Sequence, residues 1–154
     1  MKINNYFRGL VKDFLLSMYL IKKEKTMEQI LKDFTFDFFA QGKHKLTPEQ
    51  LLQMDSAILL DVRSNPEVEA ISINMSCFTN IQCKNIPLDE LPNRLEELSK
   101  HDFIAVFCPA NVRSSIAYTF LWNKGYTLIK ILEGGYPAIT EVIKPGTLLK
   151  LMKK

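Results

Sequence analysis

The fold is decided by the stretch FIAVFCPANVRSSIAYTFLWNKG at residues 103–125. Its first five residues form a short, continuous apolar run, which is typical of a strand buried on both faces of a sheet. From residue 113 to 124 the pattern becomes helical, and Gly125 follows as a helix stop. The stretch therefore predicts a buried strand, a tight loop and a helix in direct succession.

The same alternation of strands and helices continues on both sides of this stretch. Thr47 is expected to be the N-cap of a helix that begins at Pro48 and follows a short edge strand. Further strands are expected at residues 57–62, 83–86 and 127–131, and a further helix at 89–99. Strands separated by helices indicate an α/β fold with a mainly parallel sheet that is covered on both faces.

Residues 1–43 differ from the α/β domain at 44–154 and are expected to form a helical N-terminal extension. Apolar residues recur every three or four positions over 3–21 and again over 27–39, which predicts two amphipathic helices. Their apolar sides are expected to cover surface of the main domain or of a second copy of the chain, giving a homodimer. Interfacial contact with a membrane is an alternative, because lysines flank an aromatic-rich stripe. Met27 is also an alternative start codon.

The charge of the chain bears on whether it binds nucleic acid. The formal net charge is +3, and residues 1–26 hold six basic and two acidic side chains, so the remainder carries about −1. Without an Arg-rich run, nucleic acid is not expected as a partner.

Three cysteines without a CxxC pair argue against a zinc site and for a reduced, cytoplasmic setting. The apolar run FLLSMYLI at 14–21 is too short for a membrane span, which needs about 20 residues.

Cys108 comes directly after the strand at 103–107, where a parallel sheet places its ligands. A loop that runs from Cys108 straight into a helix near Arg113 turns its backbone N–H groups inward, and only Pro109 lacks this donor. These donors and the helix dipole favour the thiolate form of Cys108, and Arg113 adds a permanent positive charge that attracts anions. The alternative is that Cys108 is a buried, inert thiol. A second candidate loop, DVRSNPE at 61–67, follows a neighbouring strand.

Four motifs together resemble a rhodanese domain, which is a sulfurtransferase domain. They are LLDVRSNPE at 59–67, NIPLDEL at 85–91, CPANVRS at 108–114 and LEGG at 132–135. Their order and approximate spacing are those of the family, and the resemblance covers about residues 44–142. It implies an α/β fold around a parallel five-stranded sheet. We expect neither a cofactor nor a metal.

The resemblance also assigns roles to residues. It implies that Cys108 is a nucleophile that accepts sulfane sulfur as a persulfide and passes it to a thiol acceptor. The donor would be a small anion such as thiosulfate, oriented by Arg113, or a protein persulfide. Asp61 and Arg63 would support the site, or form an ion pair that only braces the loops. The implied substrate-binding loop consists of Pro109, Ala110, Asn111, Val112 and Arg113.

Two other functions stay open at this point. The related phosphatases and arsenate reductases have five residues between Cys and Arg, whereas only PANV separates Cys108 from Arg113. The smaller ring favours a single sulfur atom over a tetrahedral oxyanion. A rhodanese scaffold can also serve as a non-enzymatic module that binds a protein partner, because a fold does not guarantee an activity.

Three departures from the family pattern bear on the site. Asn111 stands where a glycine is common, and Asn is the next most tolerant residue of left-handed backbone angles. Ile139 stands where a Trp is frequent after LEGG. The entrance segment at 72–84 lacks the family's usual Gly and His and carries Cys77 and Cys83. These two cysteines are expected to be incidental, or else to resolve or relay the active-site persulfide.

Overall fold

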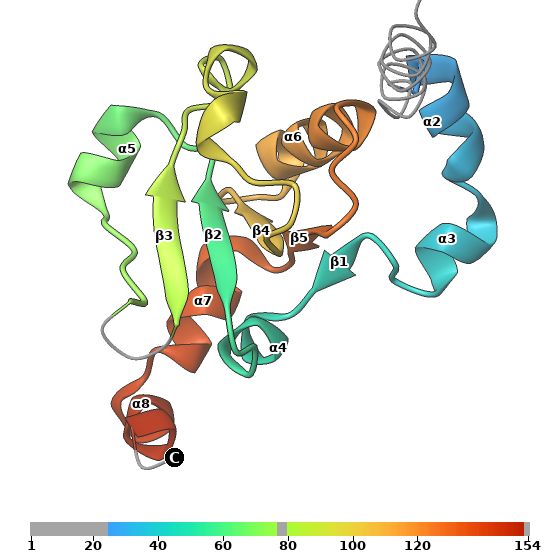
Figure 1. The fold of residues 1–154 in the computed structure, drawn as a ribbon. Helices are drawn as coiled ribbons and strands as arrows, with labels where there is room; N and C mark the ends of the chain where they lie inside the picture. The colour runs from blue at the N-terminus through green and yellow to red at the C-terminus, as the bar shows by residue number, and fades with distance from the viewer. Residues whose placement is uncertain (1–24, 77–79, 153–154) are drawn as a thin grey trace, which may run out of the picture.

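The computed structural model describes residues 25–76 and 80–152 of the chain. Five strands form one sheet in the order β1-β5-β4-β2-β3, and every neighbouring pair is parallel (Figure 1). The strands are β1 (Lys45–Leu46), β2 (Ala57–Asp61), β3 (Ile81–Asn85), β4 (Ile104–Phe107) and β5 (Ile129–Leu132). The predicted α/β fold around a five-stranded parallel sheet is confirmed.

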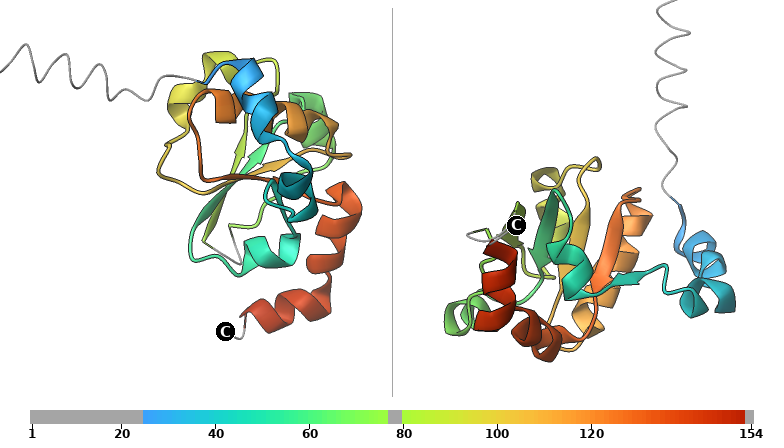
Figure 2. Two further views of the ribbon diagram at one scale, coloured as in Figure 1. Left: turned by 90° about the vertical axis from the view of Figure 1, so that its right-hand side faces the viewer. Right: turned by 90° about the horizontal axis from the view of Figure 1, so that it is seen from below.

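Helices cover both faces of this sheet, and α6 lies between the sheet and the N-terminal helices (Figure 2). The helices are α2 (Met27–Asp33), α3 (Phe36–Ala40), α4 (Pro48–Leu52), α5 (Asn65–Ala70), α6 (Val112–Asn123), α7 (Gly135–Val142) and α8 (Pro145–Met152). As expected, Thr47 caps α4, because its side chain accepts a hydrogen bond from the backbone N–H of Gln50.

The core has two halves, one on each face of the sheet. Successive side chains of a strand point to opposite faces. Leu60 and Val106 therefore pack with Leu121 of α6, whereas Leu59 packs with Ile139 of α7. Burial on both faces explains why β2 and β4 are continuous apolar runs.

The parallel register brings the functional segments to one edge of the sheet. Asp61 lies opposite Phe107 of β4 on one side and Asn85 of β3 on the other. Cys108 is the next residue after Phe107 and therefore emerges beside the segment that follows β2. The two loops singled out in the sequence are neighbours in space.

The N-terminal helices pack against α6 through aromatic side chains. The ring of Phe34 lies 5.3 Å from that of Trp122, and the ring of Phe38 lies 5.4 Å from it. The prediction of one helix over 27–39 was wrong, because Thr35 caps the N–H of Phe38 and starts a second helix. The helix predicted over 3–21 lies outside the described residues.

The helix predicted over 89–99 was also wrong. This segment forms two short 3₁₀ turns, η1 (Leu91–Asn93) and η2 (Leu95–Glu97). Pro92 has no N–H for a helical hydrogen bond, and Arg94 between the turns departs from helical geometry, with φ −129° and ψ 22°. The turns bury Leu91 in the core.

Some elements were missed or shifted in the sequence prediction. α5, α7 and α8 were not predicted, and strands β3 and β5 begin two residues away from their expected starts. α5 has a readable start signal, since Ser64 and Glu67 form a capping box and Pro66 lies in the first turn. Within residues 25–76 and 80–152, no helix combines the length and apolar character needed to cross a membrane.

Candidate active site

Cys108 is buried at the point where β4 passes into the loop before α6. Only 1% of the residue is exposed. Its Sγ accepts a hydrogen bond from the backbone N–H of Ser114 at 3.3 Å and lies 3.4 Å from the Ser114 hydroxyl oxygen. Ser114 is itself buried, in the first turn of a helix of 12 residues. The sulfur thus faces an N–H donor at the positive end of α6, where negative charge is stabilised.

Asn111 gives the loop its sharp turn. Its backbone is left-handed, with φ 62°, and no other non-glycine residue in the described chain has a positive φ. With its side-chain amide oriented so that both polar atoms face a partner, Asn111 donates to the carbonyl oxygen of Leu132 at 3.1 Å and accepts from the N–H of Gly134 at 3.3 Å. Asn111 therefore takes the conformation for which glycine is common in the family, and ties the loop to the segment after β5.

Replacing Asn111 by alanine should destabilise the fold more than replacing it by glycine. Both changes remove two side-chain hydrogen bonds, worth about 1 kcal/mol each. The left-handed backbone costs alanine about 1 kcal/mol of conformational free energy, whereas glycine adopts it freely. Urea denaturation should rank the free energy of unfolding as wild type, then Asn111→Gly, then Asn111→Ala. Equal stability of the two variants would mean that the left-handed backbone is not retained in solution.

Gly135 lets the segment after β5 touch the Cys108 loop. Its φ is 56°, and a Cβ placed on it would lie 1.8 Å from the carbonyl oxygen of Pro109. No side chain larger than hydrogen fits there unless the loop moves. The second glycine of LEGG is thus required by a close backbone approach.

Arg113 is paired with Glu67 at the start of α5. Its two terminal nitrogens lie 2.6 and 2.7 Å from the two carboxylate oxygens, a bidentate geometry. The hydrogen bonds from Arg113, and then those from Ser64, hold the pKa of Glu67 well below its usual value of 4.5. Glu67 was not predicted as a site residue, although Ser64 followed by Glu67 three positions later is a pattern typical of a helix start.

Asp61 and Arg63 form an ion pair inside the protein. The Arg63 side chain is fully buried, and its Nε and Nη2 donate to the Asp61 carboxylate at 2.5 to 2.9 Å. Its Nη1 donates to the carbonyl oxygens of Glu67 and Ile71 and to the hydroxyl of Tyr136. The guanidinium therefore ties β2, α5 and α7 together. This is the bracing arrangement that the sequence left open as one of two roles for the pair.

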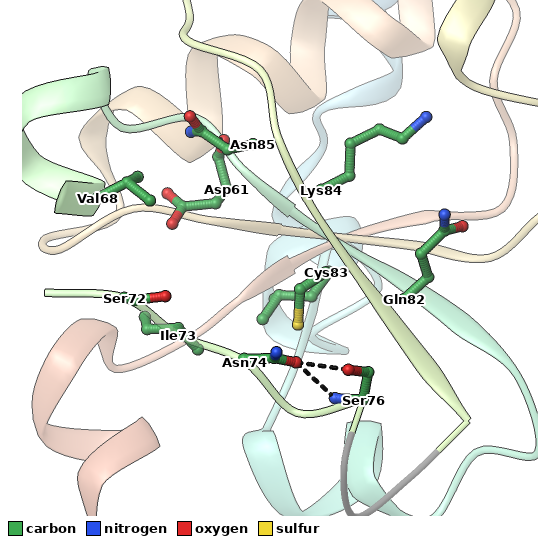
Figure 3. Close-up of a pocket in the computed structure, with 11 residues that line it drawn as sticks. Asp61, Val68, Ser72, Ile73, Asn74, Ser76, Gln82, Cys83, Lys84 and Asn85 are labelled. Carbon is green, nitrogen blue, oxygen red and sulfur yellow. Dashed lines mark hydrogen bonds between the residues drawn. The ribbon is translucent and has the colours of Figure 1, made fainter.

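Cys83 lines a cavity of about 330 Å³ beside β3, which Asp61 also lines (Figure 3). Its Sγ points towards the segment around Asn74 and Ser76 and accepts the N–H of Met75 at 3.3 Å. Burial raises the pKa of the Cys83 thiol. Cys83 packs with the core half on the α7 face, whereas Cys108 packs on the α6 face. The sheet therefore separates the two sulfurs, and Cys83 is not placed to resolve a Cys108 persulfide.

Other expectations meet the structure only in part. Cys77 lies outside the described residues. Ile139 is buried in the core half on the α7 face. Across the described ranges 25–76 and 80–152, no three His, Cys, Asp or Glu side chains gather closely enough to hold a metal ion.

We compared the chain with models of known protein families, and the result agrees with the strand–loop–helix geometry around Cys108. The family model of the Rhodanese-like domain matches residues 47–141. The chain belongs to the rhodanese-like family. The matched region begins directly after β1 and ends one residue before the end of α7. It includes the Cys108 loop, Glu67 and the Asp61–Arg63 pair.

The chain is similar to proteins from several organisms. An uncharacterized protein of Bacillus subtilis, YqhL, is 29% identical over 119 residues, which are 77% of this chain and 80% of that protein. The crystal structure of a rhodanese-related protein from Thermoplasma volcanium is 29% identical, with a TM-score of 0.54, covering 66% of this chain and 95% of that one. An NAD-dependent persulfide reductase from A. fulgidus is 29% identical with a TM-score of 0.50. The match covers 65% of this chain but only 17% of the reductase.

Proposed function

We propose that this protein is a sulfurtransferase that carries sulfane sulfur as a persulfide on Cys108. The observation that carries the proposal is the Ser114 N–H, which lies 3.3 Å from the Cys108 Sγ at the N-terminus of α6. A hydrogen-bond donor and a helix dipole directed at a thiol stabilise its thiolate, which is the nucleophilic form. The same groups stabilise the negative charge of a persulfide after transfer.

The reaction has two displacement steps that both occur at sulfur. The Cys108 thiolate attacks the outer sulfur of thiosulfate, the S–S bond of the donor breaks, and sulfite leaves with the electron pair. With a persulfide donor the leaving group is the donor's thiolate. An acceptor thiolate then attacks the outer sulfur on Cys108, takes it as a new persulfide and releases the Cys108 thiolate.

The small loop supports sulfur as the transferred group. Four residues separate Cys108 from Arg113, and the cysteine is almost completely enclosed. A single sulfur atom bonded to Sγ needs less room than a tetrahedral phosphate or arsenate. The similarity to a persulfide reductase agrees with chemistry of this kind, although the match covers a small part of that enzyme.

Reduced wild-type protein should gain the mass of one sulfur atom when it is incubated with thiosulfate or with a low-molecular-weight persulfide. Intact-mass spectrometry measures the gain, and a second incubation with excess thiol should remove it. Cys108→Ser should show no gain because the nucleophile is absent. Cys83→Ser is the matched control and should load like the wild type, since its thiol lies on the other face of the sheet.

Two results would contradict this function. Wild-type protein that gains no sulfur from either donor would favour the protein-binding module, in which the rhodanese scaffold has no catalytic role. An equal mass gain on wild type and on Cys108→Ser would show that the reactive thiol is a residue other than Cys108.

A further inference from the structure

The cation expected to attract an anionic donor is already occupied by a carboxylate of the same chain. Arg113 presents its planar guanidinium edge to Glu67 in a two-point contact. Guanidinium groups bind thiosulfate-like anions with this same fork of donors. A small anion entering the loop therefore meets an arginine whose two terminal nitrogens already bond a carboxylate.

Glu67 is held in this position from two sides. Its carboxylate accepts hydrogen bonds from the backbone N–H of Ser64 at 3.1 Å and from the Ser64 hydroxyl at 2.8 Å. These bonds belong to the capping box that starts α5. Glu67 is thus a fixed negative charge, and it remains ionised at neutral pH because the pKa of its carboxyl is lowered.

The Glu67 carboxylate lies where it can act on a sulfur donor that approaches Arg113. The side chains of Arg113 and Glu67 are 34% and 36% exposed, so the pair faces solvent at the edge of the loop that holds Cys108. Together they present no net charge, and the carboxylate repels a dianion that comes to the arginine. A donor whose charges balance feels no such repulsion.

We propose that Glu67 is a specificity-determining residue that disfavours small dianionic donors and directs Cys108 towards persulfides without net negative charge. This inference rests on the proposed sulfurtransferase function and names its donor class. Glu67 acts through Arg113 and through its own charge, and it takes no part in the covalent steps.

The test compares two donors on the full chain. Thiosulfate is the dianion, and cysteamine persulfide is the balanced donor, because its ammonium and perthiolate charges cancel. The second-order rate constant for sulfur loading of Cys108 is measured by intact mass for wild type and Glu67→Gln. Removing one charge about 6 Å from a dianion in water should raise the thiosulfate constant about tenfold. The cysteamine persulfide constant should change less than about twofold by the same Coulomb argument.

Two variants separate charge from structure. Glu69→Gln removes an exposed carboxylate from the same helix and should shift neither constant. Ser64→Ala weakens the capping box but keeps the Glu67 charge, and it should leave the ratio of the two constants unchanged. A purely structural role of Glu67 predicts instead that Glu67→Gln slows both donors equally.

The possible results distinguish failure of the Glu67 proposal from failure of the proposed sulfurtransferase function. Sulfur loading from both donors with an unchanged ratio in Glu67→Gln would overturn the role of Glu67 and leave the sulfurtransferase function standing. Absence of loading from either donor on the wild type would overturn both.

Discussion

Replacing Arg63 by methionine should lower the free energy of unfolding by about 3–5 kcal/mol, as expected when one partner of a buried ion pair is removed. Arg63 is fully buried and Asp61 is 7% exposed, so the variant leaves a carboxylate inside the protein without its cation. The change also removes the donors to the carbonyl oxygens of Glu67 and Ile71. Urea or thermal denaturation measures the loss.

An exposed arginine gives the matched control. Arg94 bonds Glu90 and Glu97 at the surface, with about a third of its side chain exposed. Arg94→Met should therefore cost much less stability than Arg63→Met. The double variant Asp61→Leu with Arg63→Met should recover part of the loss, because no charge is then left buried. A cost for Arg63→Met as small as that for Arg94→Met would contradict the bracing role.

Replacing Gly135 by alanine should slow persulfide formation on Cys108 about 100-fold, the cost typical of a displacement of about 1 Å in a reacting geometry. The new Cβ would fall 1.8 Å from the Pro109 carbonyl oxygen and 2.7 Å from its carbon. The loop must move to relieve this overlap, and the N–H of Ser114 then loses its alignment with Sγ. The measurement is the rate of sulfur loading followed by intact mass.

Gly125→Ala controls for the backbone strain in this experiment. Gly125 also has a positive φ, of 85°, but a Cβ there would meet only the Lys100 Nζ, at 3.5 Å. Both variants should lose about 1–2 kcal/mol of stability from the left-handed conformation. Only Gly135→Ala should lose loading activity. Full activity in Gly135→Ala would show that the loop adapts without moving Cys108.

The strands could be predicted from the sequence because their burial leaves a direct trace. β2 and β4 are covered on both faces, and this requires the continuous apolar runs AILL and IAVF. The turns η1 and η2 could not be predicted from the same pattern. Their leucines recur at nearly helical spacing, and Pro92 acts through a missing hydrogen bond that periodicity does not record.

The candidate site, too, has features that the sequence predicts and others that it does not. The order Cys108, short loop, Arg113 and helix could be read directly, since these residues are adjacent in the chain. The partner of Arg113 lies 46 positions earlier and meets it only through the parallel register of β2 and β4. Contacts of this kind depend on how the strands align, so the engagement of the guanidinium by Glu67 appears only in three dimensions.

The placement of the two described cysteines on opposite faces of the sheet has a consequence for turnover. A protein whose nucleophile had a second thiol within reach could discharge its sulfur internally and rest as an intramolecular disulfide. Cys83 cannot offer this route to Cys108. In the proposed sulfurtransferase, sulfur on Cys108 would therefore not pass to Cys83 and would leave when an acceptor molecule collides with the loaded protein. The lifetime of the persulfide would then depend on the concentration of that acceptor.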